Sequence, residues 1–218
     1  MIIKVRFKGG PGSGHFGHIG RPGLRGGSLP GKGGGGKAPS LKVMHRGKET
    51  RPNEYEATWM ALILRRHPTK VVSQLNGIVI CDTEEDWREQ YRKMVGEGDY
   101  KNCGGFYVGH SKTIYLPPKY NRLAVDHEIG HRAYWAAYIV GATRAWDNAY
   151  DNSMRFDRHT TYSSSGVTEA FAESYAAWVQ TGGKVANVLE LPQNVFTHNS
   201  HHIADTFDVM QKAIDAIQ

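Results

Sequence analysis

Two histidines and a glutamate in the stretch VDHEIGHRAYW, residues 125–135, have the spacing of a metal-binding helix. In the H-E-x-x-H pattern, His127 and His131 lie about 40° apart on one helical face, so both imidazoles can reach the same ion. Glu128 is rotated by about 100° from His127, which places its carboxylate beside a metal-bound water and not on the metal. Such a carboxylate can take a proton from the water and pass it to a leaving amine. The pattern therefore predicts a zinc site with Glu128 as general base.

A third metal ligand must come from elsewhere, because a catalytic zinc ion is normally held by three protein side chains. The metzincin spacing H-E-x-x-H-x-x-G-x-x-H is excluded, since Tyr134 and Ala137 stand where it requires glycine and histidine. The remaining common solution is a glutamate on a second helix. The stretch TEAFAESYAAW supplies Glu169 and Glu173 on one helical face that they share with alanines. These small residues would let the second helix approach the first closely.

Arg132 and four further histidines are expected to face solvent. Arg132 directly follows the second histidine and is expected to lean outward. Four more histidines lie in polar stretches and are interpreted as solvated and not as ligands. They are His159, His198, His201 and His202.

The basic charge of the chain is confined to its N-terminal part. The 218 residues have a formal net charge of +6, from 27 Lys and Arg against 21 Asp and Glu. Residues 1–48 hold ten of the basic residues and no acidic residue, so the other 17 basic and 21 acidic residues give the remainder a net charge of −4. Glycine makes up half of residues 9–36, a composition too poor in apolar side chains to form a core. We therefore expect a disordered basic tail over residues 1–48, capable of weak nucleic-acid contact, and one domain over residues 49–218.

Residues 52 onward alternate helical and strand-like patterns, which predicts an α+β domain. Thr83 and Asn121 are expected to cap helices, as is Ser164 or Ser165, and a loop-rich region is expected around Trp146. The patterns predict helices at 53–66, 83–95, 122–140, 166–181 and 203–217, a strand at 76–82 and a hairpin at 104–118.

The cysteines and the hydropathy of the chain bear on where in the cell the protein is expected to be. Cys81 and Cys103 fit either one bridge or two free thiols. The stretch MIIKVRFK is too short and too interrupted by charge to be expected to act as a signal peptide, and the sequence has no run of about 18 apolar residues. We therefore expect no membrane span and a protein made in the cytoplasm.

The stretch HEIGH followed by TYSSSGVTEAFAES resembles the peptidase domain of the anthrax toxin lethal factor group. In that group a tyrosine follows HExxH and precedes, by seven residues, a glutamate that opens an E-x-F-A-E helix; Tyr162 and Glu169 have this spacing. The resemblance covers roughly residues 76–180. It implies a zincin-like fold, in which a small mixed sheet with an edge hairpin packs on two central helices.

The same resemblance implies roles for individual residues. Glu169 would be the third zinc ligand, and Glu173 would orient a ligand histidine. Tyr162 would donate its hydroxyl to the oxyanion of the tetrahedral intermediate. The implied activity is that of a gluzincin-type metalloendopeptidase with one Zn²⁺ per chain acting on a peptide or protein, although a site of two histidines and a glutamate also suits cobalt or manganese.

The hairpin before the motif helix supplies the expected substrate contact. In zinc peptidases of this general build, an edge strand beside the active site pairs with extended substrate. The stretch KTIYL, with Thr113, Ile114 and Tyr115, is the strand to which this implies main-chain hydrogen bonds from a peptide. An ordinary sheet strand explains the same pattern.

The glycine-rich stretch GPGSGHFGHIGRPGLRGGS resembles a low-complexity segment of head-morphogenesis and other structural proteins of tailed bacteriophages. This implies a phage or prophage origin and a virion-associated location, with the tail as a tether or a contact to packaged DNA. A solubilising linker explains the composition equally well. Two alternatives to a phage peptidase stay open: a virion structural or DNA-contacting protein with a peptidase-like fold, and a toxin or effector protease that acts on a host protein.

Overall fold

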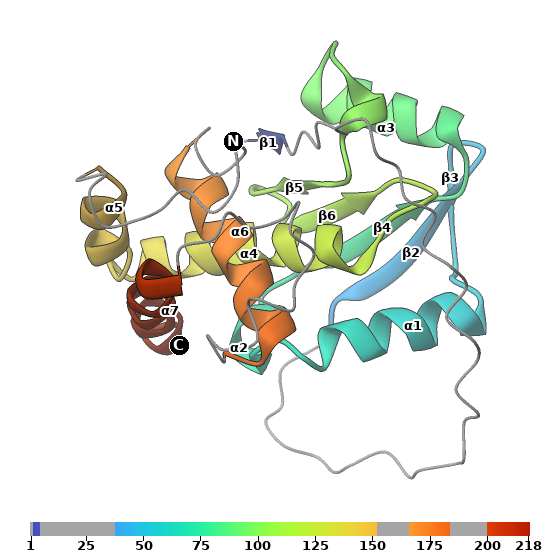
Figure 1. Cartoon of the computed structure of the whole chain (residues 1–218). Helices are drawn as coiled ribbons and strands as arrows, with labels where there is room; N and C mark the ends of the chain where they lie inside the picture. The colour runs from blue at the N-terminus through green and yellow to red at the C-terminus, as the bar shows by residue number, and fades with distance from the viewer. Residues whose placement is uncertain (1, 5–37, 152–165, 184–199) are drawn as a thin grey trace, which may run out of the picture.

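The structure is a computed structural model that describes residues 2–4, 38–151, 166–183 and 200–218, with the backbone alone for residues 2–4 and 200–205. These residues form a mixed sheet with helices on both faces, so the fold is α+β as expected (Figure 1). No helix among the described residues is long and apolar enough to cross a membrane.

Six strands of the described chain form one sheet in the order β1-β5-β6-β4-β2-β3. The central strands β6, β4 and β2 run parallel to one another. The outer strands β5, β1 and β3 run antiparallel to their neighbours. The strands are β1 (Ile2–Lys4), β2 (Ser40–His45), β3 (Lys48–Thr50), β4 (Gly77–Cys81), β5 (Phe106–Val108) and β6 (Thr113–Leu116).

The N-terminal boundary of the folded part differs from the expected position. The sheet includes β2, which begins at Ser40, and Val43 and Met44 on this strand are buried. It also includes β1, at residues 2–4. The expected boundary between residues 48 and 49 is therefore wrong, because β2 is too short and too mixed in composition to be recognised without its partner β4. Residues 5–37, on which the expected disorder of the tail depends, lie outside the described residues.

The helices agree with most of the predicted segments. They are α1 (Glu54–Leu64), α2 (Thr69–Val72), α3 (Glu84–Val95), the 3₁₀ helix η1 (Tyr100–Asn102), α4 (Arg122–Ile139), α5 (Arg144–Asp151), α6 (Val167–Thr181) and α7 (Ser200–Asp215). The side chains of Thr83 and Asn121 accept hydrogen bonds from the backbone N–H of Asp86 and Ala124, so both expected caps are confirmed.

Two local predictions differ from the structure. The N-cap of α6 is Gly166 and not a serine; Ser164 and Ser165 lie outside the described residues. The expected loop around Trp146 is the helix α5, whose tryptophan is fully buried and packs edge-on against Phe171. A single buried side chain in a polar segment carries too little periodicity to predict this helix.

The two faces of the sheet contribute to separate cores. Along β4, Ile78 and Ile80 face one core and Val79 and Cys81 the other, as the period of two in a strand requires. The first core also contains side chains of α1, α4, α6 and α7, and the second contains Trp87 of α3. Helix α3 thus covers one face of the sheet and α4 the other (Figure 1).

Candidate metal centre

Helix α4 places His127 and His131 side by side in the interior of the protein. Both side chains are completely buried. Their Nε2 atoms are 3.1 Å apart, as the separation of four residues on one helical face predicts. Asn121 fixes the start of this helix with its side chain, and Gly141, at a φ of 72°, follows its end. The two imidazoles therefore project from a helix that is defined at both ends.

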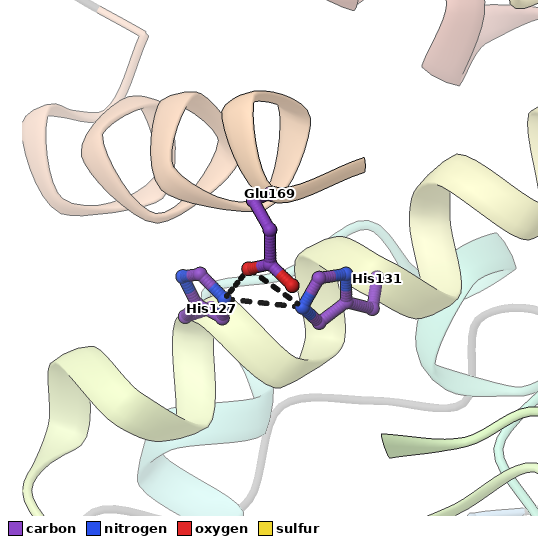
Figure 2. A group of neighbouring side chains, drawn as sticks. All are labelled: His127, His131 and Glu169. Atoms are coloured by element: carbon purple, nitrogen blue, oxygen red, sulfur yellow. Dashed lines mark hydrogen bonds and ion pairs between the residues drawn. The ribbon is translucent and has the colours of Figure 1, made fainter. Parts of the chain in front are cut away.

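Helix α6 brings Glu169 to the same point (Figure 2). Its Oε2 atom lies 3.2 Å from Nε2 of His127 and 3.4 Å from Nε2 of His131. The carboxylate is in the first turn of α6, and its residue is only 6% exposed. His127, His131 and Glu169 thus converge from two helices on one small volume.

The three converging atoms have the separations that a zinc ion requires. Zinc binds imidazole nitrogen and carboxylate oxygen at about 2.0–2.2 Å, so two ligands of a tetrahedral site lie about 3.4 Å apart. The observed separations of 3.1, 3.2 and 3.4 Å come close to this value. Two histidines and one carboxylate are also a donor set that zinc prefers. The residues present therefore fit a zinc ion.

Glu173 lies one helical turn after Glu169 and contacts the other nitrogen of His127. Its Oε1 atom is 2.7 Å from His127 Nδ1. Since a carboxylate can only accept, this contact assigns the proton of a neutral His127 to Nδ1 and leaves Nε2 free as a metal ligand. Such a contact both holds the imidazole ring and increases its basicity.

Glu128 lies beside the three converging residues and is also completely buried. Among the described residues no side chain donates a hydrogen bond to its carboxylate oxygens, and the neighbouring donor is the backbone N–H of Tyr107. A buried carboxylate with so few hydrogen-bond donors is costly. Such a side chain is typical of a site that acts on a bound molecule. Burial raises the pKa of Glu128 to about 8, while the charge of His127 and the backbone N–H of Tyr107 act in the opposite direction.

The charges of the cluster shift the pKa values of its other members in opposite directions. Burial alone would lower the pKa of His127, but the hydrogen bonds and charges of Glu169 and Glu173 raise it to about 10. Burial also lowers the pKa of His131, and this effect exceeds the opposite effect of the charge and hydrogen bond of Glu169. Burial would raise the pKa of Glu169, but the two histidines lower it to about 2. Glu169 is therefore ionised at neutral pH.

The two helices that carry the cluster are in direct backbone contact. A Cβ atom placed on Gly130 would lie 2.7 Å from Cα of Ala172, closer than real Cβ contacts. The expected close approach of these helices is thus confirmed, with a glycine on α4 facing an alanine on α6. This contact brings Glu169 within reach of both histidines.

Two predicted site features are wrong. Strand β6, with Thr113, Ile114 and Tyr115, is paired with β4 on one side and β5 on the other. It is an interior strand, so its main chain cannot pair with a substrate. Arg132 does not lean outward: its side chain is buried and donates a hydrogen bond from Nη2 to Gln74.

Several predicted residues cannot be compared with the structure. Tyr162, the expected oxyanion donor, and His159 lie outside the described residues, as does His198. His201 and His202 belong to α7, but their side chains are not among those described.

A buried polar network behind the site was missed in the sequence. Asp126, next to His127, accepts hydrogen bonds at 2.7 Å from Arg66 and 2.9 Å from His67 Nε2. The other nitrogen of His67 lies 3.0 Å from the hydroxyl of Tyr175 on α6. The network joins the end of α1 to both site helices. Only an acidic residue on the apolar side of the motif helix could have indicated it.

Gly105 is a second feature that was missed. A Cβ atom at this position would lie 3.1 Å from Cγ of Glu128, so glycine leaves room for the base. The double glycine before β5 was the available signal.

No protein-family model matches the chain, and no curated protein is similar enough in sequence to count as a relative.

Proposed function

We propose that the protein is a zinc-dependent endopeptidase with a zincin-like fold. Support comes chiefly from the convergence of His127 Nε2, His131 Nε2 and Glu169 Oε2 within 3.1–3.4 Å. The completely buried carboxyl group of Glu128 lies beside them. Two parts of the arrangement, the ligand set and the base, come from residues that the HExxH pattern and the later glutamate helix predicted.

A zinc ion in this site would supply Lewis acidity, which lowers the pKa of water and polarises a substrate carbonyl. Glu128 would accept the proton of the attacking water and donate it to the nitrogen of the leaving amine. Its raised pKa suits a group that must hold and release a proton near neutral pH. Glu173 would keep the ring of His127 in the orientation that directs Nε2 to the ion.

Zinc content and hydrolysis together test the proposal. The purified chain is loaded with zinc, dialysed and analysed for metal, beside Glu169→Gln, Glu173→Gln and Glu128→Gln. Glu89→Gln, on the exposed face of α3, is the matched control. Hydrolysis is followed with unfolded casein.

We expect about one zinc per chain in the wild type and in Glu89→Gln. Glu169→Gln should lose the metal, because it replaces a ligand. Glu173→Gln should bind zinc about 10- to 100-fold more weakly. Glu128→Gln should keep the metal and lose hydrolysis by about 10²- to 10⁴-fold. A wild type that holds no zinc after loading would show that the cluster is only a set of buried hydrogen bonds.

A further inference from the structure

The strand that borders the candidate site is β5. Gly105 directly precedes this strand and lies against Glu128, and helix α4 contacts β5 along the sheet. On one side β5 pairs with β6. Its other side faces away from the rest of the sheet, and it is the side on which an additional strand can pair.

In the structure this side of β5 is occupied by the N-terminal strand β1. The two strands are antiparallel, with Ile2 opposite Val108, Ile3 opposite Tyr107 and Lys4 opposite Phe106. The chain direction of β1 therefore runs toward Gly105 and the base. Residues 2–4 thus hold the position that an extended peptide would take if it added to the sheet beside Glu128.

The attachment of β1 to the sheet is small. The strand has three residues and, among the described strands, pairs with β5 alone, at the edge of the sheet. Its ladder contains few hydrogen bonds, and every one of them could be replaced by the main chain of another extended peptide. By contrast, β6 pairs with β4 along its whole length and with β5 over residues 113–115. Of the two hairpin strands near the site, β5 and not β6 is therefore the one where an edge strand can be exchanged.

We propose that β1 is a self-inhibitory strand, which a substrate peptide must displace from β5 in order to reach the site. The substrate is then an extended peptide recognised by main-chain hydrogen bonds, antiparallel to β5. This inference rests on the proposed endopeptidase function for its biological meaning. The exchange of strands itself requires no metal and can be measured without one.

The test weakens the ladder of β1 without removing the segment. In an antiparallel ladder successive N–H groups alternate in direction, so one of the N–H groups of Ile3 and Lys4 points to β5. The double variant Ile3→Pro/Lys4→Pro removes it, whichever it is. The double variant Ile3→Ala/Lys4→Ala keeps both N–H groups and is the matched control.

The full chain, metal-free and zinc-loaded, carries Glu128→Gln so that it cannot cleave the probe. The probe is a fluorescent peptide with the sequence of residues 1–8, MIIKVRFK. If β1 is docked in about nine-tenths of the molecules, the proline variant should bind the probe about tenfold more tightly than the wild type, and the alanine variant should resemble the wild type. Among residues 106–108, the amides that point to β1 should exchange faster in the proline variant and slowly again when the probe binds, whereas those that point to β6 should not change.

Equal affinity of all three proteins for the probe, or binding that leaves exchange at residues 106–108 unchanged, would overturn the inference. Failure of the proposed function looks different. In that case strand exchange occurs in the metal-free protein, but the zinc-loaded chain with Glu128 restored does not hydrolyse casein.

Discussion

The substitution Gly130→Ala tests whether the contact between α4 and α6 sets the geometry of the metal site. A Cβ atom there would lie 2.7 Å from Cα of Ala172, whereas ordinary contact begins at 3.4 Å. The atom that it meets belongs to the backbone of a helix and cannot rotate away. The helices must therefore separate by about 0.7 Å, and Glu169 moves with α6. Metal–ligand distances tolerate only about 0.2 Å.

We expect Gly130→Ala to weaken zinc binding by about 10- to 100-fold, the loss typical of a ligand that is badly oriented. The stability of the metal-free protein should change less. Overpacking lowers the free energy of unfolding by about 1–3 kcal/mol, but alanine in place of glycine within a helix raises it by up to about 1 kcal/mol. Competition with a chromophoric chelator measures the zinc affinity, and urea unfolding in the presence of EDTA measures the stability.

Gly166→Ala is the matched control, because a Cβ atom at the start of α6 would have no neighbour within 4 Å in the part of the chain that the structure describes. The φ of Gly166 is 169°, an extended conformation that alanine adopts freely. The control should bind zinc as the wild type does. If Gly130→Ala does so too, the close approach of the helices does not determine the position of Glu169, and the reasoning fails.

Three further predictions concern stability. Zinc at about 100 times its dissociation constant should raise the free energy of unfolding by about 2.7 kcal/mol, and EDTA should abolish the resulting rise in Tm seen by calorimetry. Asp126→Ala should lower the free energy of unfolding in urea by about 3–5 kcal/mol, since it leaves buried partners unpaired, whereas Asp208→Ala, at an exposed ion pair with Lys212, should change it by about 0–1 kcal/mol. Burial acts to raise the pKa of Asp86, but hydrogen bonds from Thr83 and from the backbone of the β2–β3 turn hold it below 3.8. Its stabilisation is thus complete above pH 3.8 and disappears as the pH falls through the lower folded value, so the difference in unfolding free energy between wild type and Asp86→Asn should shrink in acid.

The features predicted correctly depend on residues that are close in the chain. Thr83 and Asn121 cap their helices because the hydrogen bond joins residues three apart. The strands of the β5–β6 hairpin lie within one short segment, and their alternation identifies both. Helical phase likewise predicted that His127 and His131 share a face. Each of these predictions needs only local geometry.

The features predicted wrongly depend on partners that are distant in the chain. Strand β6 is interior because β4, more than 30 residues earlier, pairs with it. Strand β2 pairs with β4 across a similar separation, which moves the domain boundary before residue 48. Arg132 is buried because Gln74, at the end of the α2 region, accepts its hydrogen bond. Alternation and composition contain no signal for any of these partners.

The site itself lies between these two cases. The alanines beside Glu169 predicted that α6 could come close to α4, but not that it would meet Gly130. The two histidines predicted a metal site and left the third ligand open between Glu169 and Glu173. In the structure the two carboxylates contact different nitrogens of His127. Glu169 lies at Nε2, on the side of the other histidine, and Glu173 lies at Nδ1.

This arrangement gathers three carboxyl groups in a largely buried site. Glu128, Glu169 and Glu173 surround two imidazoles, and all five side chains are buried or nearly so. Buried carboxylates are costly unless a cation lies among them. Arg132 on the same helix bonds to Gln74 instead, and Arg66 bonds to Asp126. In the metal-free protein Glu169 and Glu173 hold a proton on His127, whose pKa they raise to about 10. A divalent ion between His127, His131 and Glu169 would take the place of that proton, so the carboxylates that the metal-free fold must neutralise are also those that would make it bind a metal tightly.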